Sequence, residues 1–213
     1  MTRIVWLRHG RTAWNQEGRF QGQIDIPLDD IGQAQAERAA SYLIHLEPSV
    51  IVSSDLERAV QTARPLADLA GISISTDARL RETHAGSWQG LTHGEIREQF
   101  GPSLDQWTAG VDVRPGGGET RREVGQRVSE SVAEYVQTHE GKTIVVVTHG
   151  GSARAGIGML LGLPDHLWLS LGVLANCSWS IMTPSGHQPP APPWRLTEYN
   201  AGSLPAPVLG DDR

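Results

Sequence analysis

Short apolar runs alternate along the chain with stretches in which apolar residues recur at helical spacing. Short runs rich in β-branched and other apolar residues, bounded by turn residues, predict buried strands. These runs are Ile4–Leu7, Val50–Ser53, Ile72–Ser75, Thr143–Thr148, Ser178–Met182 and Trp194–Glu198. Strands that alternate with helices predict an α/β protein, here a three-layer α/β/α sandwich around a mostly parallel sheet.

Helical spacing is clearest in two stretches, each with a predicted capping box at its start. Such a box pairs a Ser or Thr with a Glu three positions later, and their side chains satisfy free backbone N–H groups. The two helices are Leu56–Ala70, with Ser54 and Glu57, and Val124–Val136, with Thr120 and Glu123. Weaker patterns predict a helix over Ile31–Leu46 and another that begins just after His149.

The stretch from Glu82 to Gly118 departs from this alternation. It contains Trp88, Trp107, several glycines and Pro115, and we expect a long excursion over one face of the sheet. Long irregular connections in compact domains are often functional. Gly116-Gly117-Gly118 follows no predicted strand, so a hinge before the next helix is favoured over a phosphate-binding loop.

The length and the even distribution of these elements indicate one domain. The chain has 213 residues, enough for one substantial hydrophobic core. No internal repeat or linker divides it, and we predict a single domain over residues 1–200. Gly186–Pro193 is expected to be a proline-rich turn into the last strand, and residues 201–213 a loose C-terminal tail.

Composition excludes several classes of partner. Hydrophobic residues make up 38% of the chain and charged residues 20%, a balance typical of a globular protein rather than a disordered one. The formal net charge is −6. An acidic protein lacks the broad basic surface that non-specific binding to nucleic acids or membranes requires, so we expect neither partner. Any anion that it binds must meet a local cluster of positive charge.

Three features indicate a cytoplasmic protein. Cys177 is the single cysteine, so it cannot form an internal disulfide and fits a reducing compartment. Met1 runs almost directly into Ile4–Leu7, an apolar run too short for the core of a signal peptide. No apolar run approaches the ~18 residues that a membrane-spanning helix needs.

Polar and charged residues follow the carboxyl ends of three predicted strands, which is where ligands bind in open α/β sheets. These residues are Arg8-His9-Gly10, Arg11, Asn15 and Gln21-Gly22 after the first strand, Ser54, Asp55 and Arg58 after the second, and His149-Gly150-Gly151 after Thr143–Thr148. Two histidines and at least two arginines beside helix N-termini make a compact cationic site. In an acidic protein, such a site predicts a phosphate ligand.

Each of these residues alone has a simpler interpretation. A histidine after a strand is commonly a turn residue, and Arg58 alone would be a solvated residue on a helix face. Neither interpretation explains two His-Gly turns and an Arg turn at equivalent strand ends. Eight histidines raise the question of a metal, but the chain has no HExxH motif and no paired Cys/His spacing. We therefore expect no metal site and no cofactor.

A series of short motifs covers roughly Ile4 to Gly151. The motifs are Leu7-Arg8-His9-Gly10-Arg11-Thr12 through Trp14-Asn15, then Gln21-Gly22, Ser53-Ser54-Asp55-Leu56-Glu57-Arg58-Ala59, Leu80-Arg81-Glu82, Gly86-Ser87-Trp88-Gln89-Gly90, Gly117-Gly118-Glu119-Thr120 and Thr148-His149-Gly150-Gly151. In this order they resemble the histidine phosphatase superfamily, which includes cofactor-dependent phosphoglycerate mutase. The resemblance implies a phosphoglycerate mutase-like fold. Arg11 departs from the pattern, which often has Glu or Gln there, and adds positive charge at the mouth of the site.

The resemblance also implies a role for each site residue. His9 would be the nucleophile, with one ring nitrogen protonated so that the other keeps its lone pair for attack on phosphorus. Arg8, Arg58 and His149 would hold the non-bridging oxygens, and Glu82 would protonate the leaving oxygen and later take a proton from water. Further substrate-binding positions would be Asn15, Gln21, Gly22 and Gly150.

The same phosphohistidine could serve a mutase or a hydrolase. A mutase needs extra cationic residues for a second phosphate, and the larger mutases carry them in a basic insertion with paired arginines. In the excursion 82–118, which we expect over the active site, the stretch Leu91–Pro115 has only Arg97 and Arg114. A phosphatase is therefore favoured over a mutase. A non-catalytic module that binds phosphorylated ligands is disfavoured, because the whole catalytic set is present.

Four further stretches resemble phosphatases of this superfamily that act on a glycosylated phosphoglycerate. They are Leu80–His84, Trp88–His93, Asn176–Trp179 and Trp194–Leu196. The substrate is thus expected to be a small phosphorylated metabolite, with His84, Trp88 and Trp107 as candidates to line its pocket, since tryptophan rings stack on sugars. By analogy with the family, we expect a homodimer.

Overall fold

The computed structural model describes residues 1–187 and 192–202. Part of the predicted proline-rich turn, residues 188–191, and residues 203–213 of the predicted tail lie outside the described residues. The described strands form one six-stranded sheet in the order β3-β2-β4-β1-β5-β6. Their bounds are β1 Arg3–Arg8, β2 Val50–Ser53, β3 Ile74–Thr76, β4 Thr143–Thr148, β5 Trp179–Pro184 and β6 Trp194–Ala201. The first four are mutually parallel, while β5 pairs antiparallel with β1 and with β6.

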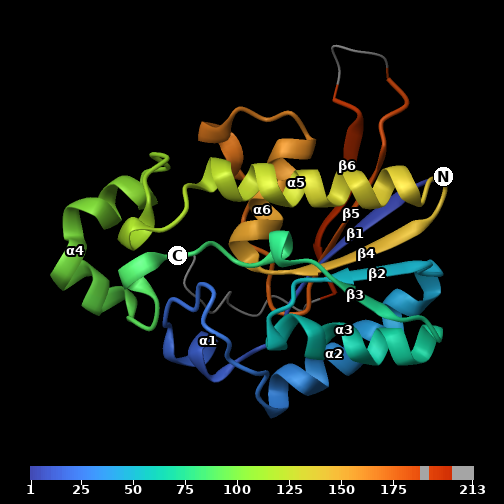
Figure 1. Ribbon diagram of the computed structural model, residues 1–213, viewed down its shortest axis with the longest axis horizontal. Helices are drawn as coiled ribbons and strands as arrows, with labels where there is room; N and C mark the ends of the chain where they lie inside the picture. The colour runs from blue at the N-terminus through green and yellow to red at the C-terminus, as the bar shows by residue number, and fades with distance from the viewer. Residues whose placement is uncertain (188–191, 203–213) are drawn as a thin grey trace.

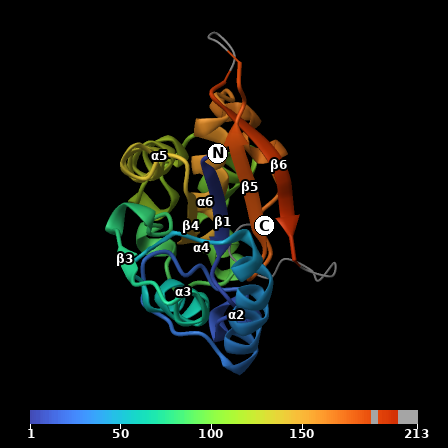
Figure 2. The same ribbon diagram turned by 90° about the vertical axis from the view of Figure 1, so that its right-hand side faces the viewer.

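Helices cover both faces of this sheet. The α-helices are α1 Ala13–Glu17, α2 Asp30–Leu43, α3 Glu57–Ala70, α4 His93–Thr108, α5 Arg121–Thr138 and α6 Gly150–Leu160. Figures 1 and 2 show α2 and α3 on one side of the sheet, and α5 with α6 on the other. The predicted three-layer α/β/α sandwich with a mostly parallel sheet is therefore confirmed.

Side chains that alternate between the two faces of the central strands form the two apolar clusters, one on each face of the sheet. In β1, Val5 and Leu7 belong to the apolar cluster under α2 and α3, whereas Ile4 and Trp6 belong to the cluster under α5 and α6. Successive side chains of a strand point to opposite faces, so a strand buried on both sides is apolar throughout. The same rule applies to β4, where the four residues Ile144–Val147 are fully buried.

The excursion 82–118 is more ordered than the sequence predicts. It contains the helix α4, which begins with a Thr92–Glu95 capping box that the sequence analysis overlooked. This region has its own apolar cluster, formed by Phe20, Ala85, Trp88, Ile96, Leu104 and Trp107. It lies at the end of the molecule opposite the N-terminus, rather than flat over a face of the sheet (Figure 1).

One predicted capping box is confirmed and the other is wrong. Thr120 and Glu123 exchange the expected backbone hydrogen bonds at the start of α5. Helix α3, however, begins at Glu57 without a side-chain cap from Ser54, and the Glu57 N–H group donates to the Asp25 carboxylate at 2.7 Å instead. Ser54 has a different partner, which belongs to the site described below.

The three glycines before α5 allow close packing of two segments. A Cβ atom on Gly116 would overlap the carbonyl oxygen of Ala85, and one on Gly118 would overlap that of His84. Gly116 also has a φ of +56°, which is unfavourable for other residues. Close approach to residues 84–88 therefore accounts for Gly116 and Gly118, and a φ of +80° accounts for Gly117, so the predicted hinge is not needed to explain them.

Candidate active site

The pairing of β1 with β4 brings the two predicted histidines together. The strands run parallel with Arg8 opposite Thr148, so His9 and His149 leave the sheet at the same edge. The His9 N–H group donates to the Thr148 carbonyl oxygen at 2.9 Å. The centroids of the two imidazole rings are 5.2 Å apart. Adjacent parallel strands thus place both rings in one site, as the sequence predicts.

The geometry around His9 defines which ring nitrogen is free. Its Nδ1 atom lies 2.7 Å from the carbonyl oxygen of Gly10, and because a carbonyl only accepts, Nδ1 carries the proton. The Nε2 atom therefore keeps its lone pair in the neutral ring. Burial, followed by the positive charges of Arg58 and Arg8, holds the pKa of His9 well below its ordinary value. A neutral imidazole with a free lone pair is the form that a nucleophile needs.

His149 has the opposite tautomer. Arg58 donates through Nε to the Nδ1 atom of His149 at 3.2 Å, and a guanidinium cannot accept. The proton of the neutral ring is therefore on Nε2, which lies 2.9 Å from the Ser54 hydroxyl oxygen. Burial, then the positive charge of Arg58, holds the pKa of His149 well below its ordinary value. Ser54, taken as a helix cap in the sequence analysis, is thus a partner of this ring.

Two arginines are buried beside the histidines. Arg58 donates to the carbonyl oxygens of Gly22 at 2.7 Å and Ile24 at 2.8 Å, which ties the loop after α1 to helix α3. Arg8 is only 1% exposed and donates through Nη1 to the Leu174 carbonyl oxygen at 2.7 Å. Its buried Nε atom has no hydrogen-bond partner among the described residues. A buried cation with an unused donor is unfavourable unless an anion binds to it.

Glu82 lies at the N-terminus of α6 and is 5% exposed. Its carboxylate accepts from the backbone N–H groups of Thr83 at 2.8 Å, Gly151 at 3.0 Å and Ser152 at 3.1 Å. The Ser152 hydroxyl lies 3.2 Å away. A Cβ atom on Gly151 would come within 2.8 Å of the Glu82 Oε1 atom, so the absence of a side chain there allows this approach.

Arg127 on α5 holds the backbone around Glu82. Its guanidinium donates to the carbonyl oxygens of Arg79 at 2.6 Å, Arg81 at 2.7 Å and Glu82 at 3.0 Å. It also forms a two-point ion pair with Glu119, at 2.8 and 2.9 Å. Glu119 in turn accepts from the His84 N–H group at 2.8 Å. Arg127 and Glu119 therefore fix the chain on both sides of Glu82.

The other predicted binding residues surround Thr12. The Thr12 hydroxyl lies 3.1 Å from the Asn15 side-chain oxygen and 3.0 Å from that of Gln21. Asn176 connects this group to the nucleophile candidate, because its amide donates to the carbonyl oxygen of His9 at 3.0 Å and to Asn15 at 3.4 Å. Gly22, with a φ of +51°, follows Gln21, and the buried Gly150 begins α6.

Sequence reasoning missed several residues that support the site. Ser54 was noted at the end of β2 but given the role of a helix cap, and its contact with His149 was not predicted. Asn176 was noted only as part of a resemblance, and nothing in the sequence connects it to His9. Arg127 lies inside a helix at a position where a solvated arginine is ordinary, so its contacts with the Glu82 backbone leave no local signal.

The predicted role of the tryptophans is wrong for Trp88. This side chain is fully buried in the apolar cluster beside α4, and Trp107 is only 5% exposed there. Phe20 packs edge-on against both rings, at centroid distances of 5.7 and 5.5 Å. Core packing therefore accounts for Trp88. His84, the third pocket candidate, is exposed. Arg11, which the sequence analysis placed at the mouth of the site, pairs with Asp29 at 2.8 Å.

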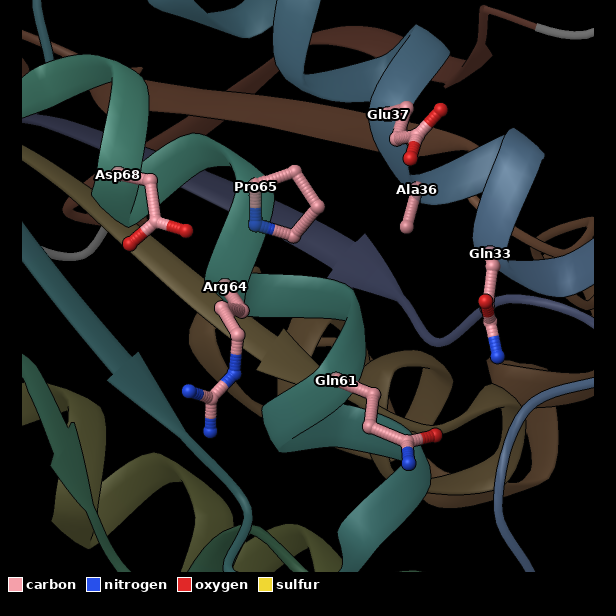
Figure 3. A pocket seen from close by; sticks show the side chains of 7 residues that line it. All are labelled: Gln33, Ala36, Glu37, Gln61, Arg64, Pro65 and Asp68. Atoms are coloured by element: carbon pink, nitrogen blue, oxygen red, sulfur yellow. The ribbon is translucent and has the colours of Figure 1, made fainter.

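A hollow elsewhere on the surface does not involve these residues. It lies between α2 and α3, and its lining includes Gln33, Glu37, Gln61, Arg64 and Asp68 (Figure 3). None of the predicted site residues contributes to it. Within residues 1–187 and 192–202, no helix could cross a membrane and no group of His, Cys, Asp and Glu side chains could hold a metal ion.

The family model described as the histidine phosphatase superfamily (branch 1) matches residues 4–197. The chain therefore belongs to this superfamily, and it is a phosphoric monoester hydrolase. Its relatives include the glucosyl-3-phosphoglycerate phosphatase of Mycobacterium tuberculosis, 40% identical over 94% of this chain and 95% of the relative. The enzyme of the same name from Mycolicibacterium vanbaalenii is 42% identical with the same coverage.

A solved structure extends the comparison to the fold. The mycobacterial glucosyl-3-phosphoglycerate phosphatase in complex with VO3 superimposes with a TM-score of 0.86. The two sequences are 40% identical, and the match covers 94% of this chain and 99% of the other. The phosphoglycerate mutase-like fold expected from the motifs is confirmed.

The contacts of the two histidines generate a prediction about their protonation. Both rings should remain neutral as the pH falls through about 6.5, because their pKa values lie well below that ordinary value. Nitrogen NMR of histidine-labelled protein should show the proton of His9 on Nδ1 and that of His149 on Nε2. His9→Gln and His149→Gln assign the two sets of signals. A ring that becomes protonated above about pH 6.5 contradicts the prediction.

Proposed function

We propose that the enzyme hydrolyses its phosphomonoester through a phosphohistidine on His9. The observation that carries this proposal is the buried Arg8, whose Nε donor is unused, next to a histidine with a free Nε2 lone pair. A phosphoryl group held by the arginine would satisfy the donor and present its phosphorus to the imidazole. A single phosphoryl group would thus accept a hydrogen bond from Arg8 and provide the phosphorus atom that His9 attacks.

In the first step, the His9 Nε2 atom forms a bond to phosphorus as the bond to the leaving oxygen breaks. Arg8, Arg58 and His149 would stabilise the charge on the non-bridging oxygens, with help from Asn15, Gln21, Gly22 and Gly150. Glu82 would give its proton to the leaving alkoxide. In the second step, Glu82 takes a proton from water, the oxygen attacks phosphorus, and inorganic phosphate leaves His9.

Fixed cations account for the expectation that no divalent metal is needed. Transition-state charge in phosphoryl transfer is commonly balanced by Mg²⁺, and here Arg8, Arg58 and the hydrogen-bonding groups would do this. We further propose a cytoplasmic enzyme, which Cys177 supports because a single cysteine cannot form an internal disulfide and fits a reducing compartment. A homodimer is proposed on family analogy, and sedimentation equilibrium tests it.

Hydrolysis is favoured over mutase activity by the partners of two arginines. Arg97 and Arg114 are the basic residues of the stretch Leu91–Pro115 that could hold a second phosphate. Arg97 forms an ion pair with Asp105, and Arg114 pairs with Glu123 at 2.6 Å. Because these cations already have carboxylate partners, a doubly phosphorylated intermediate would lack a second site, and water would reach the phosphohistidine.

For the substrate, we propose a small, anionic, glycosylated phosphomonoester such as glucosyl-3-phosphoglycerate. The support is the name shared by the mycobacterial relatives, which align with nearly the whole of this chain. Phosphoglycerate mutase-type phosphotransfer remains the second candidate. A non-catalytic phosphate-binding module is disfavoured, because His9, Glu82 and His149 are all present.

The phosphohistidine should be trapped on His9. Quenching the enzyme during turnover of a slow substrate and mapping the adduct by mass spectrometry should locate the phosphoryl group there. His9→Ala should lower kcat by at least about 10³-fold, as loss of a covalent nucleophile does in other enzymes. Label on His149, or a loss of less than about tenfold, would falsify the assignment.

Glu82→Gln should slow alkyl phosphates by about 10²–10⁴-fold and aryl phosphates much less, because a phenolate leaves without a proton. Arg127→Gln should shift the same ratio in the same direction by a smaller factor, since it loosens the backbone that carries Glu82. Arg122→Gln, on the same helix but largely exposed, is the matched control. Equal losses on both substrate types would assign Glu82 to binding or folding.

A panel of phosphomonoesters should separate the candidate functions. With 3-phosphoglycerate as the substrate, release of inorganic phosphate should exceed formation of 2-phosphoglycerate, because Arg97 and Arg114 already pair with carboxylates. The highest kcat/KM should belong to glucosyl-3-phosphoglycerate, and a chelator should not lower the rates. Isomerisation faster than phosphate release would favour the mutase, and a flat profile would remove the glycosyl preference.

A further inference from the structure

The side chain of Gln35, in helix α2, contacts the backbone directly beyond the proposed nucleophile. Its Oε1 atom accepts a hydrogen bond from the Arg11 N–H group at 2.9 Å. This N–H group belongs to the same peptide unit as the Gly10 carbonyl oxygen, which lies 2.7 Å from the Nδ1 atom of His9. One peptide unit therefore connects α2 to the imidazole of His9.

Close packing of two backbone segments brings Gln35 to this peptide unit. A Cβ atom on Gly32, in the first turn of α2, would overlap the carbonyl oxygen of Arg11, and one on Gly10 would overlap that of Gly32. The absence of side chains at these two glycines lets the segments meet. Gln35 is three residues beyond Gly32 and so lies on the same face of the helix, next to the Arg11 N–H group.

The direction of the peptide unit between Gly10 and Arg11 decides which ring nitrogen of His9 is protonated. Because a trans peptide is planar, its N–H and C=O groups point in opposite directions. In the observed orientation, the carbonyl oxygen accepts from Nδ1, and Nε2 keeps its lone pair. If the unit turned over, the Arg11 N–H group would face the ring, Nδ1 would have to accept, and the proton would be on Nε2. The ring would then have no lone pair to offer phosphorus.

The preceding peptide unit, between His9 and Gly10, is held by other residues. Its carbonyl oxygen accepts from the Asn176 amide at 3.0 Å, and its N–H group donates to the Thr62 hydroxyl at 2.9 Å. These contacts fix the main chain at the nucleophile, but the Gly10 carbonyl group that meets the ring belongs to the next unit. The contact with Gln35 acts on that unit directly.

We infer that Gln35 is a positioning residue, which keeps the lone pair of His9 on Nε2 by holding the Gly10–Arg11 peptide unit in its observed orientation. The inference rests on the proposed function, because it takes His9 as the nucleophile. An amide oxygen only accepts hydrogen bonds, so it stabilises the orientation that turns the Arg11 N–H group away from the ring.

Anchoring of α2 does not depend on Gln35. The Asp29 carboxylate caps the helix by accepting from the Gly32 N–H group at 2.8 Å. The Asp29 N–H group donates to the Arg11 carbonyl oxygen at 3.0 Å, and the two side chains form an ion pair at 2.8 Å. Loss of the Gln35 acceptor should therefore leave the helix in place and free the peptide unit to turn over.

The test compares two inhibitors that need different states of His9. Inorganic phosphate binds through the cations of the site, whereas vanadate accepts the free ring nitrogen as an additional ligand and so resembles the transition state. Gln35→Met should weaken vanadate inhibition of aryl phosphate hydrolysis by about 5- to 50-fold, the effect of leaving an N–H group without its acceptor. The kcat/KM of the aryl phosphate should fall in parallel, and phosphate inhibition should change by less than about threefold.

Two further variants separate the hydrogen bond from the fold. Gln35→Glu keeps an oxygen acceptor at the same position, so its ratio of vanadate to phosphate inhibition constants should stay within about threefold of the wild-type ratio. Gln33→Met makes the same replacement at an exposed position of the same helix and should leave both constants unchanged. Incomplete folding of a variant would lower kcat without changing either constant, because inhibition constants do not depend on the fraction of active enzyme.

Nitrogen NMR of histidine-labelled protein reads the proton of His9 directly. In Gln35→Met, the His9 signals should change from the Nδ1-protonated form towards a mixture with the Nε2-protonated form, and those of His149 should stay as they are. Gln35→Glu should retain the Nδ1-protonated form of His9.

The possible outcomes separate this inference from the proposed function. A Gln35→Met enzyme that keeps the wild-type vanadate constant and the Nδ1 proton of His9 would overturn the inference. Equal weakening of vanadate and phosphate inhibition, or equal effects of Gln35→Met and Gln35→Glu, would overturn it as well, by assigning Gln35 to the fold of the site. Trapping of the phosphoryl group on His149 would instead refute the proposed nucleophile, and the NMR signals would still show whether Gln35 sets the protonation of His9.

Discussion

The parallel pairing of β1 with β4 is the constraint on which the rest of the site depends. It places Arg8 opposite Thr148, so that each strand ends in a histidine at the same sheet edge. A slip of β1 by one residue would move Trp6 into the layer where Val5 and Leu7 pack, and the mismatch in side-chain size opposes this shift. Packing of the hydrophobic core thereby sets the distance between His9 and His149. Neighbouring residues then orient the two rings through hydrogen bonds.

Burial gives this site its chemical character. Arg8 and Arg58 lie next to two imidazoles in a region from which water is largely removed, so their charges are screened little. Their effect on the rings is to oppose protonation, while their effect on an approaching phosphate is attraction. In the proposed mechanism, the same cations would keep the nucleophile neutral and bind the phosphate that it attacks. Backbone N–H groups, among them two at the start of α6, hold the carboxylate of Glu82, the residue proposed for acid-base catalysis.

The sequence predicts the residues at the sheet edge well, because each of them follows an apolar strand within a few positions of the chain. The strands β1, β2 and β4 are apolar runs, and His9, Arg58 and His149 follow them within a few residues. Interactions between distant segments have no such signal: Ser54 has a cap-like position but contacts His149, and Arg127 contacts the Glu82 backbone from inside an ordinary helix. The helix α4 was overlooked because its glycine and proline, which bend it near Phe100, resemble those of a loop. Trp88 was assigned to substrate because composition cannot distinguish a buried ring from an accessible one.

The separate apolar cluster beside α4 has a consequence for how such an enzyme can diverge. Phe20, Trp88 and Trp107 pack mainly on one another, whereas the strands that carry the predicted phosphate-binding residues are supported by the two clusters against the sheet. A substitution in this smaller cluster can be compensated by its own neighbours without disturbing the strand ends. The region around α4 can therefore change in sequence while the residues at the strand ends stay the same, so related chains can keep one arrangement of histidines and arginines beside a variable neighbouring structure.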